Sequence, residues 1–360
     1  MAEPKGKPPH AGEPLTREDV LRLIEEHGGP EGLDLREADL EKANLSELNL
    51  QDADLSGANL QRANLCLSRL HRARLLEAKL QAADLRWAQF PAANLHQANL
   101  GGANLRLANL PEADLSLANL QETELSEASL QAATLHWANL QGARCLETKL
   151  QGADLWQANL QTANLRGANL QGADLRRADL RRARLAWANL RDANLEGANW
   201  GDYVLGDEIR SDFGEAASAY RALKQRHTEA DMYDIAGEFH YREMEARRKL
   251  AWKERRLPYA LGMYALRFLY GYGERPERVI GWVVAVILGF ALGHWLFSTV
   301  AGGLLDALYY SAVSFTALGY GKWAAEPQGW AGRFLGVGES LLGVFMMALF
   351  LVTFTRKMTR

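Results

Sequence analysis

Cysteine is almost absent from this sequence of 360 residues, in which Cys66 and Cys145 are the only two. Two such residues allow neither a disulfide framework nor a cysteine-based metal site. The sequence also lacks an HExxH motif, a phosphate-binding glycine loop and the motif of a nucleophilic enzyme. Its formal net charge of −3 gives no electrostatic basis for binding nucleic acid. We therefore predict a protein that is not an enzyme, uses no cofactor and binds no nucleic acid.

The N-terminus has no hydrophobic run of the kind found in a signal peptide. Residues 1–15 are rich in proline and glycine, and we predict a disordered tail there. We predict a capping helix over residues 16–30, because the T-R-E-D pattern that begins at Thr16 has the form of a helix N-terminus and is followed by apolar residues at helical spacing. This helix is expected to end at Gly28 and Gly29.

Residues 31–201 repeat every five residues, as in GANLQRANL and QGADLWQANL. Leucine occupies nearly every position whose number ends in 0 or 5, and alanine occupies most positions ending in 3 or 8. A five-residue period fits neither an α-helix nor an alternating strand, but it fits a coil with flat sides whose two apolar columns point inward. Cys145 replaces one of the leucines, so we expect it to be a small buried hydrophobic residue.

This pattern resembles the pentapeptide-repeat family, A-(D/N)-L-X-X. The resemblance implies a right-handed quadrilateral β-helix with four pentapeptides per turn. The Asp or Asn before each leucine should form hydrogen bonds in the turns. Some family members imitate the negative charge of DNA, but 21 acidic and 18 basic residues between Glu31 and Trp200 are nearly balanced and argue against that role. We interpret the rod as a domain for assembly or regulation, or as a binding face for an unidentified cytosolic ligand or protein.

The five-residue rhythm stops at residue 201, and helical spacing begins in a linker over residues 202–278. Two amphipathic helices, 216–226 and 232–250, are predicted to form a hairpin. A third helix over residues 259–270 would suit the inner membrane surface, with Gly271-Tyr272-Gly273 as an interfacial turn after it. The stretch AGEFHYREMEARRK resembles the linker of bacterial proteins that join pentapeptide repeats to a two-span ion channel.

One helix of this linker carries residues that could be drawn as a metal site. These are His240 with Glu238 and Glu243. On a charged helix we interpret them instead as part of a solvated face, and no catalytic role is assigned to them.

Two apolar segments in residues 279–360 are long enough to cross a membrane, since a spanning helix needs about 20 apolar residues. The first, 279–300, contains His294 as its only ionisable group, and the second, 334–355, contains Glu339 as its only charge. Basic residues precede the first span and follow the second, whereas Lys322 and Arg333 are the only ones between them. The positive-inside rule then places both termini in the cytoplasm of a multi-pass inner-membrane protein.

Between the spans, residues 304–315 could form a re-entrant helix that enters the membrane about halfway. The sequence TALGYG follows at residues 316–321. This stretch resembles the signature of potassium channels, a pore helix followed by T-V-G-Y-G, in which rings of backbone carbonyls replace the water around the ion. Glycine takes at low cost the backbone angles that point successive carbonyls to one side, which accounts for Gly319 and Gly321.

The resemblance implies a role for each residue of this region. The selectivity filter would consist of the backbone carbonyls of Thr316, Ala317, Leu318, Gly319, Tyr320 and Gly321, with potassium as the permeant ion and the only bound metal. Tyr309, Tyr310 and Glu339 would support the filter, and Lys322 and Glu326 would lie at its outer mouth. Glu339 is expected to bond the pore-loop backbone or Lys322, and His294 to serve in packing. Gly338 and Gly343 are candidate hinges, or else sites of close helix packing.

Two positions depart from the family pattern. The family usually has threonine where this chain has Ala317, so the innermost ion site should lose four oxygens and bind more weakly. The family also usually has aspartate where this chain has Lys322, which would put positive charge at the outer mouth unless Glu326 pairs with it.

The predicted fold is thus a multidomain membrane protein with a cytosolic β-helix, an α-helical linker and an all-α pore domain of two spans and one re-entrant helix. One pore segment cannot surround an ion, so a homotetramer within the lipid bilayer is expected. The expected function is a potassium-permeable channel. The alternatives are a weakly selective cation channel and a membrane-tethered scaffold or binding protein.

Overall fold

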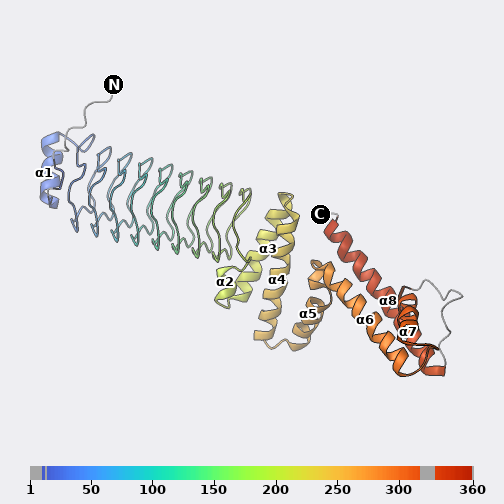
Figure 1. Cartoon of the computed structure of the whole chain (residues 1–360). Helices are drawn as coiled ribbons and strands as arrows, with labels where there is room; N and C mark the ends of the chain where they lie inside the picture. The colour runs from blue at the N-terminus through green and yellow to red at the C-terminus, as the bar shows by residue number, and fades with distance from the viewer. Residues whose placement is uncertain (1–9, 13, 317–328, 359–360) are drawn as a thin grey trace. The chain divides into compact units, whose positions relative to one another are not determined.

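The computed structural model describes residues 10–12, 14–316 and 329–358. The chain divides into two compact units, Met1–Ala246 and Arg247–Arg360. Figure 1 shows that the first unit contains the repeats and helices α1 to α3, and that the second contains helices α5 to α8. Most of the predicted tail and filter residues Ala317 to Gly321 lie outside the described residues.

The repeats form a regular coil that returns to the same corner every 20 residues (Figure 1). Parallel β-bridges join residues 20 positions apart throughout, from Asp34 and Asp54 to Asp179 and Asn199. Each turn therefore holds four pentapeptides, as predicted. Along residues 34–199 these pairings are single bridges separated by turns rather than continuous strands. The right-handed sense of the coil stays a prediction.

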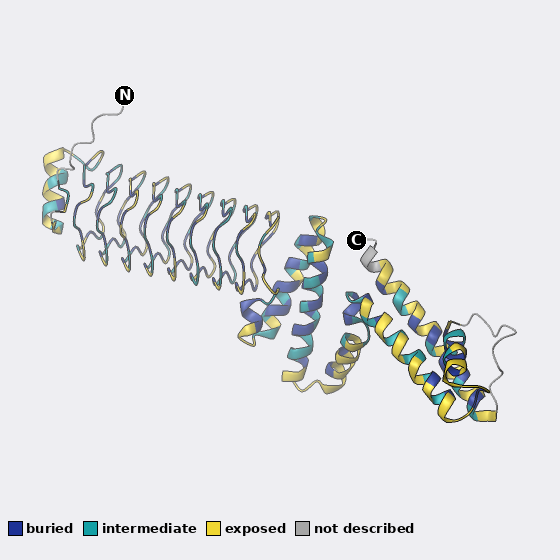
Figure 2. Ribbon diagram, viewed as in Figure 1, coloured by how far each residue is buried: buried dark blue, intermediate teal, exposed yellow. Residues whose placement is uncertain are grey.

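The two apolar columns of the repeats fill the inside of the coil, as predicted. Leu60 and Ala63 are both completely buried, and the same holds for almost every leucine and alanine in these columns (Figure 2). Each buried leucine contributes roughly 1.5–3 kcal/mol of hydrophobic stabilisation. Cys145 lies in the leucine column, where burial raises the pKa of its thiol to about 12. Its predicted role as a small buried hydrophobic residue is confirmed.

The polar residue before each leucine holds the turns together. Asn49 Oδ1 accepts a hydrogen bond from the N–H of Gln51 at 3.2 Å, and this arrangement recurs in most coils. Many of these amides also donate to the equivalent side chain one coil earlier, as Asn119 Nδ2 does to Asn99 Oδ1 at 3.1 Å. The predicted turn hydrogen bonds are therefore confirmed, and they form ladders along the corners of the rod.

Helix α1, Arg17–His27, covers the first coil and agrees with the helix predicted for residues 16–30. Thr16 and Asp19 form a reciprocal capping box, and Gly28 ends the helix in the left-handed conformation at φ 81°. The Arg17 guanidinium donates to two carbonyl oxygens of the coil below. Residues 11 and 14 also form bridges to the first coil, which the prediction of a tail through residue 15 did not anticipate.

The last coil is covered by a helical cap. Helices α2, Gly206–Ile209, and α3, Phe213–Glu229, follow the repeats, and α4, Tyr233–Lys253, begins in the first unit. Trp200 replaces the last inward leucine and packs edge-on against Phe239, with ring centroids 5.0 Å apart. The buried hydroxyl of Tyr220 donates to Glu208 at 2.6 Å. Helices α3 and α4 extend further than the predicted 216–226 and 232–250 but correspond to them.

One prediction about α4 is wrong. Glu243 is not on a solvated face: its side chain is 2% exposed and forms ion pairs with Arg221 and Lys224 of α3, each at 3.1 Å. His240, one turn earlier, lies 3.9 Å from the same carboxylate. Burial opposes ionisation, but the hydrogen bonds from Arg221 and Lys224 and the nearby His240 ring outweigh it and lower the pKa of Glu243. The carboxylate therefore joins the two helices of the hairpin.

We expect Glu243→Gln to destabilise the hairpin by about 2 kcal/mol at neutral pH, because the two cations lose the buried negative charge with which they pair. A lowered pKa means that the carboxylate stabilises the fold above its unfolded pKa of about 4.3 and loses this effect as the pH falls further. Thermal unfolding between about pH 3 and pH 7 should therefore show a shallower acid decline in the variant. Glu229→Gln removes an exposed helix-surface pair and should change stability by less than about 1 kcal/mol. Equal losses in both variants would contradict the assignment.

The elements that the structure describes in the second unit are all helices. Its α7 matches the predicted re-entrant segment 304–315, and α6 and α8 cover most of spans 279–300 and 334–355, each shifted or extended toward its N-terminus. The predicted turn after α5 is present as a short 3₁₀ element, with Tyr272 at φ 59°. The elements are α5, Leu257–Tyr270; η1, Gly271–Gly273; α6, Pro276–Leu296; α7, Leu304–Thr316; and α8, Gly329–Met358.

Candidate functional site

Helix α7 is held between the two long helices by side-chain to backbone hydrogen bonds. The hydroxyl of Ser311 donates to the Ile287 carbonyl oxygen of α6 at 2.8 Å. The hydroxyl of Ser340 on α8 donates to the Ser314 carbonyl oxygen at 3.0 Å. Phe315 belongs to the apolar core that these three helices share. Bonds to both neighbours fix the position of α7 along its axis and its rotation about it.

The two ends of α7 are defined by local chemistry. At its start, the carboxylate of Asp306 accepts the N–H of Gly303 at 2.7 Å, and negative charge at this end is favoured by the helix dipole. At its other end, the Thr316 hydroxyl donates back to the Ala312 carbonyl oxygen at 3.0 Å. The carbonyl end of the helix thus directly precedes residue 317. The predicted filter positions 317–321, with Lys322 and Glu326, lie outside the described residues, and their roles stay predictions.

Gly343 is the point at which α8 comes closest to the end of α7. A Cβ atom at this position would overlap the carbonyl oxygen of Phe315 and lie 2.7 Å from its carbonyl carbon. Only glycine leaves room for this approach of two backbones. By contrast, a Cβ atom at Gly338 would meet no atom of the described residues within 4 Å. The two candidate hinges therefore differ: close packing accounts for Gly343 but not for Gly338.

A cluster of buried polar side chains joins all three helices. Glu339 of α8 and His294 of α6 are both completely buried, with Glu339 Oε2 3.6 Å from His294 Nε2. The Ser311 hydroxyl of α7 also lies within hydrogen-bond distance of Glu339 Oε1. On its other side, the His294 ring has Nδ1 2.7 Å from the Thr299 hydroxyl, and the ring packs against Tyr310 with centroids 4.8 Å apart. We call these five residues the His294–Glu339 cluster.

The sequence prediction missed the part that His294 plays. His294 was expected only to pack, whereas it is the neighbour of Glu339. The signal was present, because each span contains a single ionisable group, and such groups in adjacent spans often pair. The proposed bond between Glu339 and Lys322 stays a prediction, since Lys322 lies outside the described residues. The two tyrosines predicted to support the filter also differ, since Tyr310 is buried and Tyr309 is about half exposed.

Comparison with known families matches the repeats to one family and the C-terminal helices to another. The model of the pentapeptide-repeat family matches overlapping stretches between residues 34 and 197. The model of the ion-channel family matches residues 271–360, which include the whole of α6, α7 and α8. The chain is a pentapeptide-repeat protein with an ion-channel domain. None of the curated proteins matches it.

Several solved structures are similar to the repeats. HetL, a pentapeptide repeat protein involved in heterocyst differentiation regulation from Nostoc sp. strain PCC 7120, is 28% identical over 51% of this chain and 94% of its own, with a TM-score of 0.26. Rfr23 from Cyanothece 51142 is 31% identical over 32% of this chain and 90% of its own, with a TM-score of 0.27. The protein alr5209 from Nostoc PCC 7120 is 37% identical over 30% of this chain and 84% of its own, with a TM-score of 0.16. At these TM-scores the superpositions carry no functional argument.

The ion-channel domain contains two helices long and apolar enough to cross a membrane, Pro276–Leu296 and Gly329–Thr355. Both have a mean hydropathy of 2.1, yet only 17% and 22% of their most apolar stretches are buried within the chain. On α6, Ile280, Val284 and Leu288 form an exposed apolar stripe at helical spacing. Soluble monomers rarely expose so much contiguous apolar surface. The ion-channel domain therefore needs lipid and neighbouring subunits to cover it.

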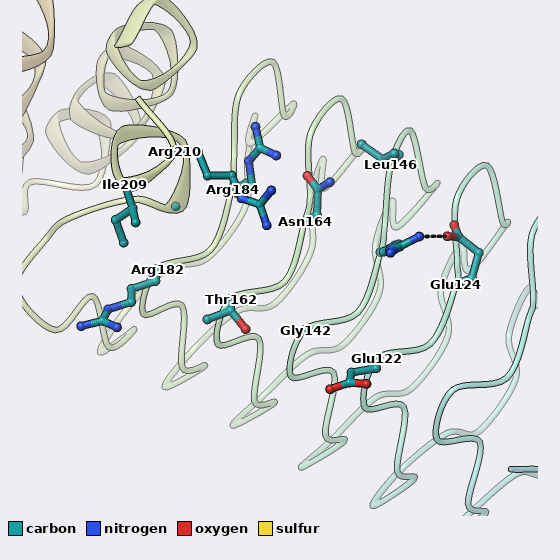
Figure 3. Close-up of a pocket in the computed structure, with 12 residues that line it drawn as sticks. Glu122, Glu124, Gly142, Leu146, Thr162, Asn164, Arg182, Arg184, Ile209 and Arg210 are labelled. Atoms are coloured by element: carbon teal, nitrogen blue, oxygen red, sulfur yellow. Dashed lines mark ion pairs between the residues drawn. The ribbon is translucent and has the colours of Figure 1, made fainter. Parts of the chain in front are cut away.

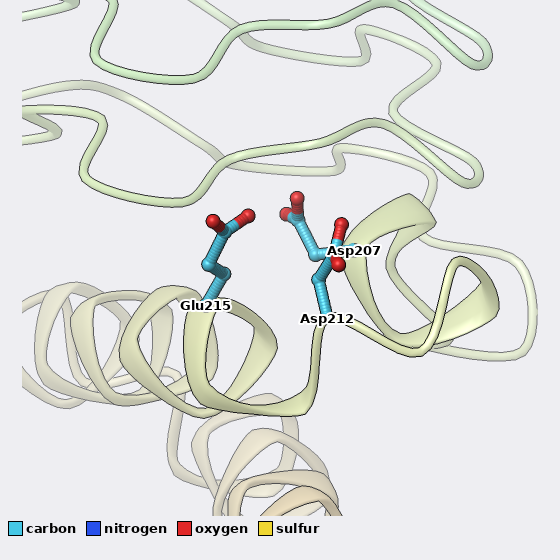
Figure 4. A group of neighbouring side chains, drawn as sticks. All are labelled: Asp207, Asp212 and Glu215. Atoms are coloured by element: carbon cyan, nitrogen blue, oxygen red, sulfur yellow. The ribbon is translucent and has the colours of Figure 1, made fainter.

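Outside the ion-channel domain, three carboxylates that follow the repeats could be taken for a metal site (Figure 4). They belong to Asp207, Asp212 and Glu215. Their ligand atoms lie within 4.8 Å of one another. However, the buried Arg184 guanidinium lies 2.9 Å from Asp207 and 2.8 Å from Asp212, and also pairs with Glu215 at 3.5 Å. Arginine thus already supplies the positive charge that a metal would bring. We interpret the group as an ion-pair cluster that fastens α2 and α3 to the last coil.

Proposed function

We propose that the protein is a homotetrameric, potassium-permeable channel whose filter is formed by residues 316–321. One observation carries this proposal: α7 ends at Thr316, the first residue of the TALGYG sequence, and is held between two membrane-length helices by Ser311 and Ser340. This is the arrangement that a pore helix needs, because its negative C-terminal end must face a cation. A short helix with this support can present the carbonyls that follow it to an ion.

Four copies are proposed because each chain supplies one filter segment, and a ring of carbonyls needs several. The exposed apolar stripes on α6 and α8 offer surfaces for neighbouring subunits as well as for lipid. We further propose that both termini and the repeats lie in the cytoplasm, since basic residues are concentrated before the first span and after the second rather than between them. The repeats would then serve assembly or regulation of the channel.

A second candidate function is a weakly selective cation channel, which two residues of the sequence favour. Ala317 has no hydroxyl to offer at the innermost ion site, and Lys322 adds a positive charge beside the filter. Both changes weaken the preference for potassium without removing the backbone carbonyls. A membrane-tethered scaffold, which would conduct no ions, is the third possibility to be tested.

The reversal potential of the purified protein in a planar bilayer separates these functions. With potassium on one side and sodium on the other, each tenfold preference for potassium shifts the reversal by about 59 mV for a monovalent ion. We expect a large shift toward the potassium equilibrium value. A reversal near zero would favour the weakly selective channel, and no current at all would favour the scaffold.

Matched variants connect the result to the filter. If current is weakly selective, the double variant Ala317→Thr and Lys322→Asp restores the family pattern and should move the reversal toward potassium. Ala317→Thr alone would identify the hydroxyl ring as the missing element, and Lys322→Asp alone would identify the charge. No change in either variant would contradict the placement of residues 316–321 in the conduction path.

A further inference from the structure

The outer face of the last coils contains a polar groove. Its volume is about 840 Å³, and it is closed at one end by α2 (Figure 3). Two stacked columns of side chains, each with one residue per coil, form its floor and sides. One column is Glu122, Gly142, Thr162 and Arg182, and the other is Glu124, Arg144, Asn164 and Arg184. Its size is within the range of about 300–1,000 Å³ that is typical of small-molecule sites.

The groove coincides with a break in the pattern of the rod. Elsewhere in this part of the rod, Asn or Asp stands before most of the leucines and closes the turn, as Asn159 does by accepting the N–H of Gln161 at 3.1 Å. In the grooved column, Arg144 and Arg184 replace these residues on either side of Asn164. The Oδ1 atom of Asn164 is buried and has no hydrogen-bond partner among the residues that the structure describes. A buried acceptor without a donor is costly, so this atom is suited to a donor from a ligand.

The charges of the groove divide it into two ends. Next to α2, Arg184 is already neutralised by its three carboxylates. Arg182 and Arg210 are exposed there and form no ion pair with any described residue. At the opposite end, Glu124 pairs with Arg144 at 3.6 Å, and Glu122 is unpaired within the described chain. One end therefore offers two unpaired arginines, whereas the other offers an unpaired carboxylate.

From these features we propose that the groove binds a small phosphate ester that carries hydroxyl groups. Its phosphate would bind at the α2 end, where Arg182 and Arg210 are the exposed arginines, because arginine binds oxyanions with paired N–H donors. A phosphate monoester carries about −1.5 to −2 charges at neutral pH, which matches two unpaired arginines. Its hydroxyl groups would donate to Asn164 Oδ1 and Glu122. The acidic end repels the phosphate, which fixes the direction in which the ligand lies.

The position of the groove gives such a ligand access to the joint between the rod and its cap. Gly206 of α2 lines the groove, and a Cβ atom there would lie 2.8 Å from Cγ of Arg184. Arg184 in turn fastens α2 and α3 to the last coil. A ligand bound beside it would stabilise this joint by its binding free energy. The same chemistry occurs in sugar phosphates and in nucleotides, and the experiment distinguishes the two.

The test is isothermal titration calorimetry on the full-length protein in detergent, with inorganic phosphate, glucose 6-phosphate and AMP as separate probes. We expect one of the two esters to bind with a Kd below about 1 mM and more tightly than inorganic phosphate. Combining Arg182→Ala with Arg210→Ala should weaken that binding at least tenfold. Asn164→Leu should weaken the ester and leave inorganic phosphate unchanged. The tighter of the two esters identifies the class of ligand.

Arg62 supplies the matched control, because it occupies the same corner column as Arg182 six coils earlier and has the same left-handed backbone, at φ 56° against 58°. Arg62→Ala should leave binding unchanged. The proposal is overturned if neither ester binds, if the double variant binds as tightly as the natural chain, or if Arg62→Ala weakens binding equally. Inorganic phosphate binding as tightly as both esters would also overturn it. Binding is measured without ion current, so this result does not depend on the proposed channel function.

Discussion

Replacing Gly343 with alanine is expected to abolish channel current. The added methyl group would overlap the carbonyl oxygen of Phe315, so α8 must move away from the end of α7 or the backbone there must shift. Overpacking of this kind costs about 3 kcal/mol where neither side can give way. Thr316, the last residue of α7, is also the first residue of the proposed filter, so the displacement would disturb the carbonyls that follow. Thermal unfolding in detergent and single-channel recording would detect both effects.

Gly338 provides the control on the same helix. An alanine there meets no atom within 4 Å in the part of the chain that the structure describes, and it should stabilise α8 by up to about 1 kcal/mol because glycine is a poor helix former. If Gly338→Ala unfolds normally but loses current, then Gly338 acts as a hinge. If Gly343→Ala keeps both its stability and its current, the close approach of α8 to Phe315 does not matter for function, and the packing explanation fails.

The parts of the fold that the sequence predicted are those governed by short-range rules. A five-residue repeat requires the same environment at every fifth residue, so the burial of Leu60 and Ala63 could be foreseen from spacing alone. The cap formed by Thr16 and Asp19 is likewise local. The bounds of α7 were predicted to within one residue, since its length and apolar character are continuous in the sequence.

The features that were missed depend on contacts between distant segments. From the sequence, Glu243 was predicted to be solvated because its own helix is highly charged. The cations that pair with its buried carboxylate come from the preceding helix, α3. His294 and Glu339 are 45 positions apart in the sequence and become neighbours only when α6 and α8 pack together. The groove beside Asn164 likewise requires four coils to be stacked. A single sequence shows which residue types are present, but it does not show which of them will face one another.

The second large effect is expected at the His294–Glu339 cluster. Replacing His294 with leucine leaves the Glu339 carboxylate buried with Ser311 as its only neighbour in the cluster, and an uncompensated buried charge costs about 3–5 kcal/mol. Replacing Glu339 with leucine removes the acceptor near the Ser311 hydroxyl and the carboxylate that lies 3.6 Å from His294 Nε2. The double variant removes both members and should cost less than the sum of the two single changes. We expect a coupling free energy of about 1–3 kcal/mol, measured by thermal unfolding of the protein in detergent.

Two further variants separate the charge from the packing. Glu339→Gln keeps a side-chain oxygen for Ser311 and removes the charge, so it should be milder than Glu339→Leu. Thr299→Val removes the partner of His294 Nδ1 and leaves the contact between His294 and Glu339 intact. Its coupling free energy with Glu339→Leu should therefore be much smaller than that of His294→Leu with Glu339→Leu. If the losses of stability in His294→Leu and Glu339→Leu simply add in the double variant, the two side chains lie side by side without an energetic coupling. If the coupling is present and current is lost in both single variants, the cluster positions α7, because Glu339 reaches that helix through Ser311 and His294 reaches it through Tyr310.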